Sequence, residues 1–145
     1  MKSGIFHKRG VFWAILLLAA LMLVACAPAA PEAQPTVQTQ MEGVQLITAQ
    51  KAKEIMDGGG SAVIVDVRTR EEYDQGHIAG AVLLPDYELG SRAQTELPDK
   101  EATILVYCRS GRRSQNAAQK LAAMGYTDVR DFGGVIDWPY ELVTQ

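Results

Sequence analysis

The sequence predicts an α/β fold in which a mainly parallel, open sheet is flanked by helices on both faces. Short, continuously apolar runs such as Ala62–Asp66 and Thr103–Tyr107 recur along the chain, and such runs are typical of strands buried on both sides. Segments with helix-capping residues alternate with these runs, as in βαβ units. The chain has 145 residues, a length that suits one domain. Because parallel sheets bind ligands at the carboxyl ends of their strands, the residues that follow each strand are the first candidates for a site.

The first half of the folded region, which is expected to begin near Val44, has clear start and stop signals. Thr48 is a suitable helix N-cap, and the glycines 58–60 end that helix. Thr69 and Glu72 have capping-box spacing, so a short helix is expected to open there. The expected elements are, in order, the strand Val44–Ile47, the helix Ala49–Met56, the strand Ala62–Asp66, the short helix after Thr69, a turn at 76–80, and the strand Ala81–Leu84, stopped by Pro85.

The second half of the folded region continues the alternation. The β-rich run from Thr103 delivers Cys108 to a short loop, and a helical pattern begins at Ser114. Gly125 is the expected end of that helix, because glycine tolerates the backbone conformation that closes a helix. The expected elements are a helix around Gly90–Thr95, the strand Thr103–Tyr107, the helix Ser114–Met124, the strand Asp128–Phe132, and a terminal helix Val135–Val143.

The N-terminus has the layout of a targeting segment. Lys2, Lys8 and Arg9 precede an unbroken apolar run, Val11–Val24. The run leads into Leu-Val-Ala-Cys26, which resembles the bacterial lipobox, where the cysteine is diacylated and becomes the new N-terminus. The run is slightly long for a cleaved signal and slightly short for a membrane span, so an uncleaved signal anchor is the alternative. Both interpretations place the folded domain on a membrane and outside the cytoplasm.

Three regions are therefore expected along the chain. Residues 1–25 form a lipoprotein signal peptide, and residues 26–43 comprise the lipidated Cys26 and a Pro/Ala-rich linker. Residues 44–145 form the folded domain. At about 3.1 Å per residue, an extended linker would hold the domain up to roughly 40 Å from the bilayer. The expected location is the cell membrane, with a lipid anchor and the domain on the extracytoplasmic side.

The charge balance excludes one class of partner and favours another. The formal net charge is −3, and it becomes −6 without the three basic residues of the first ten. An acidic domain does not suggest nucleic-acid binding. The basic loop after Cys108 is a local exception to this sign, which indicates a site for a small anion.

The loop after Cys108 combines a nucleophile with the features of an anion site. Loop N–H groups and a helix N-terminus attract anions, and nearby cations favour the thiolate, which is the nucleophilic form of cysteine. If Cys26 carries lipid, Cys108 has no partner within the chain. A buried structural cysteine is the alternative, but its polar and basic neighbours in the sequence are not typical of a buried thiol. The candidate binding residues of the loop are Arg109, Ser110, Gly111, Arg112 and Arg113.

Five motifs follow one another between about Val44 and Val143. They are Asp66-Val-Arg68, Glu71-Glu72-Tyr73, the segment 76–81, the loop Cys108–Arg113, and Gly133-Gly134 with Trp138. In their order and spacing the chain resembles the rhodanese homology domain, a sulfurtransferase fold. The resemblance implies that Cys108 takes a sulfane sulfur from thiosulfate or a persulfide donor, becomes a persulfide, and passes the sulfur to a thiol or protein acceptor. It implies neither a metal nor an organic cofactor.

Guanidinium groups suit the sulfonate oxygens of thiosulfate, so Arg109, Arg112 or Arg113 is expected to bind them. Which of the three does so is left open by the sequence. A helix start after the loop adds a modest attraction for the anion, typically ~0.3–1 kcal/mol.

The remaining polar motif residues are expected to support the structure. Asp66 is expected to accept backbone N–H groups in a turn, and Arg68 to pair with Glu71 or Glu72. His77, which lies near two glycines, is expected to organise a turn and not to act as a general base. A thiolate that its loop already stabilises needs no base.

Two functional alternatives stay open. Phosphatases and arsenate reductases of the same fold carry a loop of cysteine, five residues and arginine, whereas the sixth position after Cys108 is Ser114. The shorter loop favours a sulfur atom over a phosphate. In the second alternative, the domain is a sulfane-sulfur carrier or redox module that does not catalyse repeated turnover. The sequence does not separate such a carrier from an enzyme.

Overall fold

The computed structural model describes residues 43–144 and confirms the α/β fold. Five strands form one sheet in the order β1-β5-β4-β2-β3, and every neighbouring pair is parallel. The predicted signal peptide, Cys26 and nearly all of the linker lie outside the described residues. Across those 102 described positions, no helix is long and apolar enough to cross a membrane. The strands are β1 Val44–Leu46, β2 Val63–Asp66, β3 Val82–Leu83, β4 Thr103–Cys108 and β5 Asp128–Gly134.

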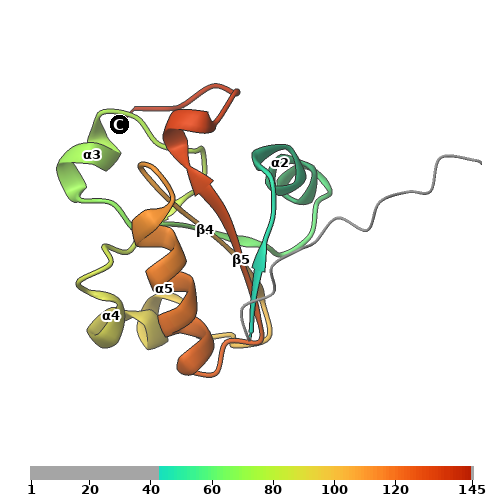
Figure 1. Cartoon of the computed structure of the whole chain (residues 1–145), viewed down its shortest axis with the longest axis vertical. Helices are drawn as coiled ribbons and strands as arrows, with labels where there is room; N and C mark the ends of the chain where they lie inside the picture. The colour runs from blue at the N-terminus through green and yellow to red at the C-terminus, as the bar shows by residue number, and fades with distance from the viewer. Residues whose placement is uncertain (1–42, 145) are drawn as a thin grey trace, which may run out of the picture. The chain divides into compact units, whose positions relative to one another are not determined.

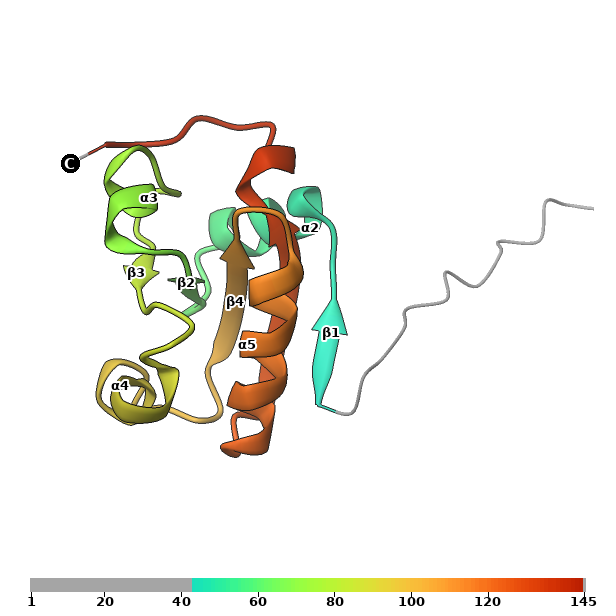
Figure 2. The ribbon, with the colours of Figure 1, turned by 60° about the vertical axis from the view of Figure 1, so that its left-hand side comes forward.

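Helices cover both faces of the sheet, as predicted (Figure 1). In Figure 2, α5 lies in front of the sheet, beside β4, and α2 lies behind β4. The side chains of α4 and α5 share one buried cluster, and those of α2 and α3 share the other. The helices are α2 Ala49–Asp57, α3 Arg70–Asp74, α4 Leu89–Glu96 and α5 Arg112–Ala123, followed by the short 3-10 helix η1 Val135–Asp137.

The central strand β4 joins the two clusters because its side chains alternate between the faces. Ile104, Val106 and Cys108 pack on the α5 side, whereas Leu105 and Tyr107 pack on the α2 side. All five are buried. A fully buried aliphatic side chain of this size stabilises the fold by ~1.5–3 kcal/mol. The position of Cys108 is therefore determined by the most deeply buried strand of the domain.

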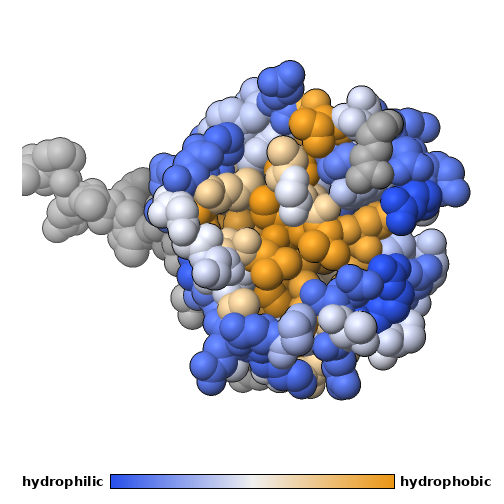
Figure 3. Space-filling view, turned by 180° about the vertical axis from the view of Figure 1, so that it is seen from behind, coloured by the Kyte–Doolittle hydropathy of each residue, from blue (hydrophilic) through white to orange (hydrophobic). Residues whose placement is uncertain are grey.

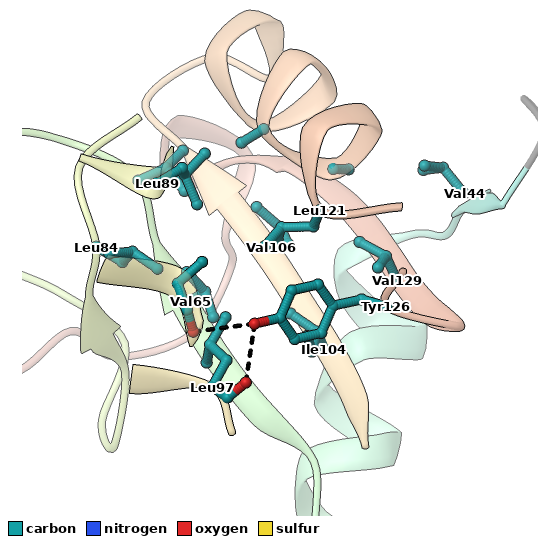
Figure 4. Close-up of a cluster of buried hydrophobic side chains, with 14 of the residues drawn as sticks. Val44, Val65, Leu84, Leu89, Leu97, Ile104, Val106, Leu121, Tyr126 and Val129 are labelled. Carbon is teal, nitrogen blue, oxygen red and sulfur yellow. Dashed lines mark hydrogen bonds between the residues drawn. The ribbon is translucent and has the colours of Figure 1, made fainter. Parts of the chain in front are cut away.

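Tyr126 closes the lower end of the cluster between α4 and α5 (Figure 4). Its ring is 2% exposed, and its hydroxyl lies 2.9 Å from the carbonyl oxygen of Ala93 and 2.8 Å from that of Leu97. Burial raises the pKa of the phenol. The tyrosine thus ties the end of α4 to the chain that follows α5.

The local helix signals are confirmed. The Thr48 side chain accepts the N–H of Lys51 at 3.1 Å. The Thr69 side chain accepts the N–H of Glu72, while the Glu72 carboxylate accepts the N–H of Thr69, which completes the capping box. Gly125 follows α5 with φ +92°, the left-handed conformation that closes a helix.

The predicted terminal helix over Val135–Val143 is wrong. Only residues Val135–Asp137 form a 3-10 turn, and Trp138 is extended. A residue before proline avoids the helical conformation, and Pro139 lacks the N–H that a helix needs. The segment 138–143 instead runs back to His77, and the N–H and C=O groups of Val143 bond those of His77 at 2.8 and 2.9 Å.

The view from behind Figure 1 shows an apolar area ringed by hydrophilic side chains (Figure 3). Several apolar residues that pack against the α2-side cluster are only partly buried. They include Ile55 and Met56 of α2 and Ile64 of β2.

Candidate active site

Cys108 ends β4 at the carboxyl edge of the sheet, as predicted. The residue is 1% exposed and pairs in register with Gly134 of β5. The sequence favoured a thiol out in the polar loop, but the cysteine lies beneath that loop and packs with the α5-side cluster. It lies there because Ile104, Val106 and Cys108 alternate onto the same buried face. Among the described residues it forms no disulfide.

The loop brings a backbone donor onto the sulfur. The N–H of Gly111 donates to Cys108 Sγ at 3.1 Å. Gly111 has φ +93°, a conformation that costs other residues energy, and α5 begins at the next residue. The helix therefore starts two residues earlier than Ser114, the predicted start. Its first N–H groups, which lack partners within the helix, lie at the end of the loop where an anion is expected.

Gly134 supports the loop from below, and sequence reasoning noted it only as a family motif. A Cβ at this position would lie 2.5 Å from the carbonyl oxygen of Arg109 and 2.7 Å from Ser110 Cα. No Cβ fits at such distances, so only glycine lets β5 pass under the loop. The carbonyl of Arg109 accepts the N–H of Ile136 at 3.2 Å, which fastens the loop to η1.

Ser114, which occupies the position of the phosphatase arginine, has a structural role. It is fully buried, and its hydroxyl lies 2.9 Å from the carbonyl oxygen of Gly111 and 3.3 Å from that of Gly133. Nearby, the buried Asp131 accepts the N–H of Gly133 at 3.0 Å, and burial raises the pKa of Asp131. These bonds hold the loop against the end of β5.

The three loop arginines have different environments. Arg113 donates two hydrogen bonds to Glu72, at 2.8 and 2.7 Å. The Arg113 guanidinium lowers the pKa of Glu72 to about 2, and Glu72 raises the pKa of Arg113. In contrast, Arg109 and Arg112 are exposed, and neither has an ion pair within residues 43–144. Of the three candidates, these two are free to meet a substrate, and the exposed Ser110 lies between them.

The prediction that Arg68 pairs with Glu71 or Glu72 is wrong. Its guanidinium binds Asp66, with Nε 2.9 Å from both carboxylate oxygens and Nη2 2.6 Å from Oδ2, and not Glu71 or Glu72. Asp66 also accepts the N–H of Arg68 at 2.9 Å, which confirms its expected role in the turn. Arg68 reaches on to the carbonyl of Gly76 at 2.7 Å. Both side chains are buried, so the pair braces the ends of β2 and α3.

His77 organises the turn after α3, as expected. Its Nδ1 lies 3.0 Å from the carbonyl oxygen of Tyr73, and its ring stacks on the Tyr73 ring with centroids 3.6 Å apart. The next N–H, that of Ile78, donates to the Tyr107 hydroxyl at 3.1 Å. Burial raises the pKa of that phenol.

A pocket of about 300 Å³ adjoins the loop on the side of Arg109, between that residue and the C-terminal segment that holds Ile136 and Leu142. Within residues 43–144, no group of three His, Cys, Asp or Glu side chains is placed to hold a metal ion. A thiol, an N–H donor on the sulfur, two free arginines and an adjacent pocket together can bind a small anion and transfer a group to or from sulfur.

Comparisons with known proteins agree with this geometry. The model of the rhodanese-like domain matches residues 48–139. A thiosulfate sulfurtransferase of Escherichia coli (strain K12), PspE, is 45% identical over 73 residues, which span 50% of this chain and 70% of the relative. The thiosulfate sulfurtransferase GlpE of Coxiella burnetii is 40% identical over 77 residues, 52% of this chain and 70% of the relative.

A solved structure described as a rhodanese with anions from E. coli superposes with a TM-score of 0.55 at 40% identity. The match covers 58% of this chain and 99% of that structure. The family model spans β2 to β5, the loop after Cys108 and Gly134. The chain belongs to the rhodanese-like domain family.

Proposed function

We propose that this protein is a thiosulfate sulfurtransferase in which Cys108 carries the sulfur. The observation that carries the proposal is the N–H of Gly111 on Cys108 Sγ, 3.1 Å away at the start of α5. This arrangement occurs in a chain of the rhodanese-like family, and the PspE and GlpE relatives described above are both named thiosulfate sulfurtransferases. Sulfur transfer is thus the reaction expected from both the sequence and the relatives.

In the first step, the Cys108 thiolate attacks the outer sulfur of thiosulfate. A new S–S bond forms, the S–S bond of thiosulfate breaks, and sulfite leaves with the electron pair. The outer sulfur then lies in the loop, where N–H groups such as that of Gly111 stabilise its charge. The free guanidinium groups of Arg109 and Arg112 are suited to the sulfonate oxygens.

The second step regenerates the Cys108 thiolate. A thiophilic acceptor such as cyanide or a thiolate attacks the outer sulfur, and Cys108 leaves as the thiolate. Neither step requires an external oxidant or reductant, because the transferred sulfur carries the oxidising equivalents from donor to acceptor.

Phosphate chemistry is the less favoured alternative. Ser114 stands at the position of the phosphatase arginine, and its hydroxyl bonds the carbonyls of Gly111 in the loop and Gly133 in β5. Arg113, one residue earlier, is held by Glu72. The sulfur-carrier alternative uses the same first step and differs only in whether the protein turns over.

The test is steady-state formation of sulfite and thiocyanate from thiosulfate and cyanide by the full-length protein. Many thiocyanate ions per protein molecule indicate an enzyme, whereas one indicates a carrier. The Cys108→Ala variant should form none. Rapid hydrolysis of an aryl phosphate without thiocyanate formation would instead favour the phosphatase alternative.

We further propose that the domain is held on the extracytoplasmic face of the cell membrane by lipid on Cys26. The support is the basic N-terminus, the apolar run and the Leu-Val-Ala-Cys sequence. Protein from membranes should lack residues 1–25 and carry acyl chains on Cys26, and Cys26→Ser should stop processing. Mass spectrometry that finds Met1 retained and no acyl chain supports the uncleaved signal anchor instead.

A further inference from the structure

Asp131 is a buried carboxylate on β5 that the two steps of sulfur transfer do not use. It is 4% exposed and forms no ion pair with any of the residues 43–144. Burial raises the pKa of Asp131, while hydrogen bonds from the Gly133 N–H and from Ser114 act in the opposite direction. A carboxylate buried without a cation costs free energy, which indicates that its hydrogen bonds have a specific role.

Strand β5 carries one extra residue directly after Asp131. Val106 of β4 pairs with Asp131, but Cys108, two residues further along β4, pairs with Gly134, three residues further along β5. Such a β-bulge leaves one residue of the longer strand unpaired and changes the direction of that strand. Here the bulge brings Gly134 into register with the cysteine, beneath the loop.

The Asp131 side chain closes this bulge. Its Oδ1 accepts the N–H of Gly133 at 3.0 Å, and a bond from a side chain to the backbone two residues on is that of an Asx turn. Gly133 has φ +90°, a left-handed conformation. Because glycine adopts many backbone conformations with similar ease, the bond from Asp131 selects this one.

A short series of contacts joins the bulge to the sulfur. The Ser114 hydroxyl lies 3.3 Å from the carbonyl oxygen of Gly133 and 2.9 Å from that of Gly111. A Cβ on Gly111 would lie 3.5 Å from Gly133 Cα, so the loop packs directly on the bulge. The N–H of Gly111 in turn donates to Cys108 Sγ at 3.1 Å. The direction of that N–H therefore depends on where the bulge holds Gly133.

Resting on the proposed function, we propose that Asp131 is a positioning residue for sulfur transfer. Its bond to Gly133 fixes the bulge, the bulge fixes Gly111, and the Gly111 N–H stabilises the charge on the sulfur. A hydrogen bond weakens steeply when its angle departs from linearity, so a displaced Gly111 slows the reaction. The binding of thiosulfate depends less on Asp131, because the exposed Arg109 and Arg112 meet the sulfonate.

Two neutral variants separate the hydrogen bond from the charge. Asp131→Asn keeps an oxygen that accepts the Gly133 N–H, whereas Asp131→Leu has a similar shape and no acceptor. Uptake of sulfur from thiosulfate by the full-length protein in a single turnover, followed by mass spectrometry, gives a limiting rate and a half-saturating concentration. Asp131→Leu should lower the limiting rate roughly tenfold and change the half-saturating concentration less than about twofold, while Asp131→Asn should recover most of the rate. Equal limiting rates in these two variants overturn the proposal.

The matched control is Asp128→Leu, at the opposite end of the same strand. Asp128 bonds Arg130 and Thr103, so its loss weakens β5 away from the loop and should leave the limiting rate unchanged. An equal loss of rate in this control assigns the effect to general destabilisation and overturns the proposal.

A backbone variant replaces Asp131→Leu if that protein does not fold. A Cβ at Gly133 meets no atom within 4 Å, but φ +90° is unfavourable for alanine, so Gly133→Ala strains the bulge without a clash. It should show the same loss of limiting rate. A wild-type rate in Gly133→Ala overturns the proposal.

An NMR measurement separates this inference from the proposed function. The amide resonance of Gly111 in the unloaded protein should move in Asp131→Leu and stay near its wild-type position in Asp131→Asn. If wild-type Cys108 takes up no sulfur, the proposed function fails, and the amide spectra still show whether Asp131 positions Gly111. If wild type takes up sulfur and Asp131→Leu keeps both its rate and its Gly111 resonance, the inference is wrong and the sulfurtransferase proposal stands.

Discussion

Glu72 of α3 and Arg113 of α5 form a two-pronged ion pair that joins the short helix after β2 to the helix that begins at the catalytic loop. The two oxygen–nitrogen distances are 2.8 and 2.7 Å, and both side chains are three-quarters buried. Glu72 also accepts the N–H of Thr69 as part of the capping box. One carboxylate therefore orders α3 and holds the end of the loop.

We expect Glu72→Gln to lower kcat/KM for thiosulfate roughly tenfold. Glutamine can keep the capping box but not the charge, so Arg113 is released from its position at the loop. Glu71→Gln is the matched control, because Glu71 is the exposed neighbour and makes no ion pair in the described part of the chain. Thiocyanate kinetics measure both variants, and equal activity in the two would contradict a role for the pair.

The same pair predicts a pH dependence of stability. Because Arg113 lowers the pKa of folded Glu72 from 4.5 to about 2, the pair stabilises the fold above pH ~4.5, and this contribution is lost as the pH falls toward 2. The difference in free energy of unfolding between wild type and Glu72→Gln should be constant from pH 7 to about 5 and shrink below that. Urea unfolding at each pH measures it, and a difference that grows on acidification would be incompatible with the ion pair.

Gly134→Ala should displace the loop. The added Cβ would meet the Arg109 carbonyl oxygen at 2.5 Å, and backbone on both sides prevents an easy adjustment. We expect a loss of sulfur uptake and a lower midpoint of thermal unfolding. Gly90→Ala is the control, because Gly90 lies in α4 with open space at its Cβ position and alanine favours helices by up to ~1 kcal/mol. Normal sulfur uptake by Gly134→Ala would show that the loop is not supported in this way.

Tyr126→Phe should lower the free energy of unfolding by about 1 kcal/mol with little effect on activity. The substitution keeps the ring but removes the hydroxyl from the Ala93 and Leu97 carbonyls. The Ala93 carbonyl keeps the N–H of Leu97, so the loss falls mainly on Leu97. Chemical unfolding compares it with Tyr87→Phe, a change at a 69% exposed ring that should be nearly neutral. Equal stabilities of the two variants would mean that the Tyr126 hydroxyl does not stabilise the fold.

Local signals along the chain were sufficient for much of the fold. Thr48, the Thr69–Glu72 capping box and Gly125 act within one helical turn, so their effects follow from neighbouring residues. The apolar runs predicted each strand to within a few residues, and Cys108 was placed correctly at the end of β4. The prediction of a terminal helix was wrong because it rested on the apolar residues of the segment and neglected Pro139, which prevents a helix there.

Relationships between distant residues could not be predicted from the sequence. Glu72 and Arg113 are 41 positions apart, and nothing in either neighbourhood indicates which arginine of the loop the glutamate selects. Arg68 pairs with Asp66, two residues away at the end of β2, and not with Glu71 or Glu72 of α3. The close approach of Gly134 to the loop depends on the pairing of β4 with β5, and the sequence showed Gly133-Gly134 only as one motif of the family resemblance.

The central claim is that Cys108 becomes a persulfide, and intact-protein mass spectrometry tests it most directly. Full-length protein incubated with thiosulfate should gain the mass of one sulfur atom, and peptide fragmentation should place that sulfur on Cys108. Cyanide should remove it, and Cys108→Ala should gain none. A wild-type protein that gains no sulfur at Cys108 under these conditions would contradict the account.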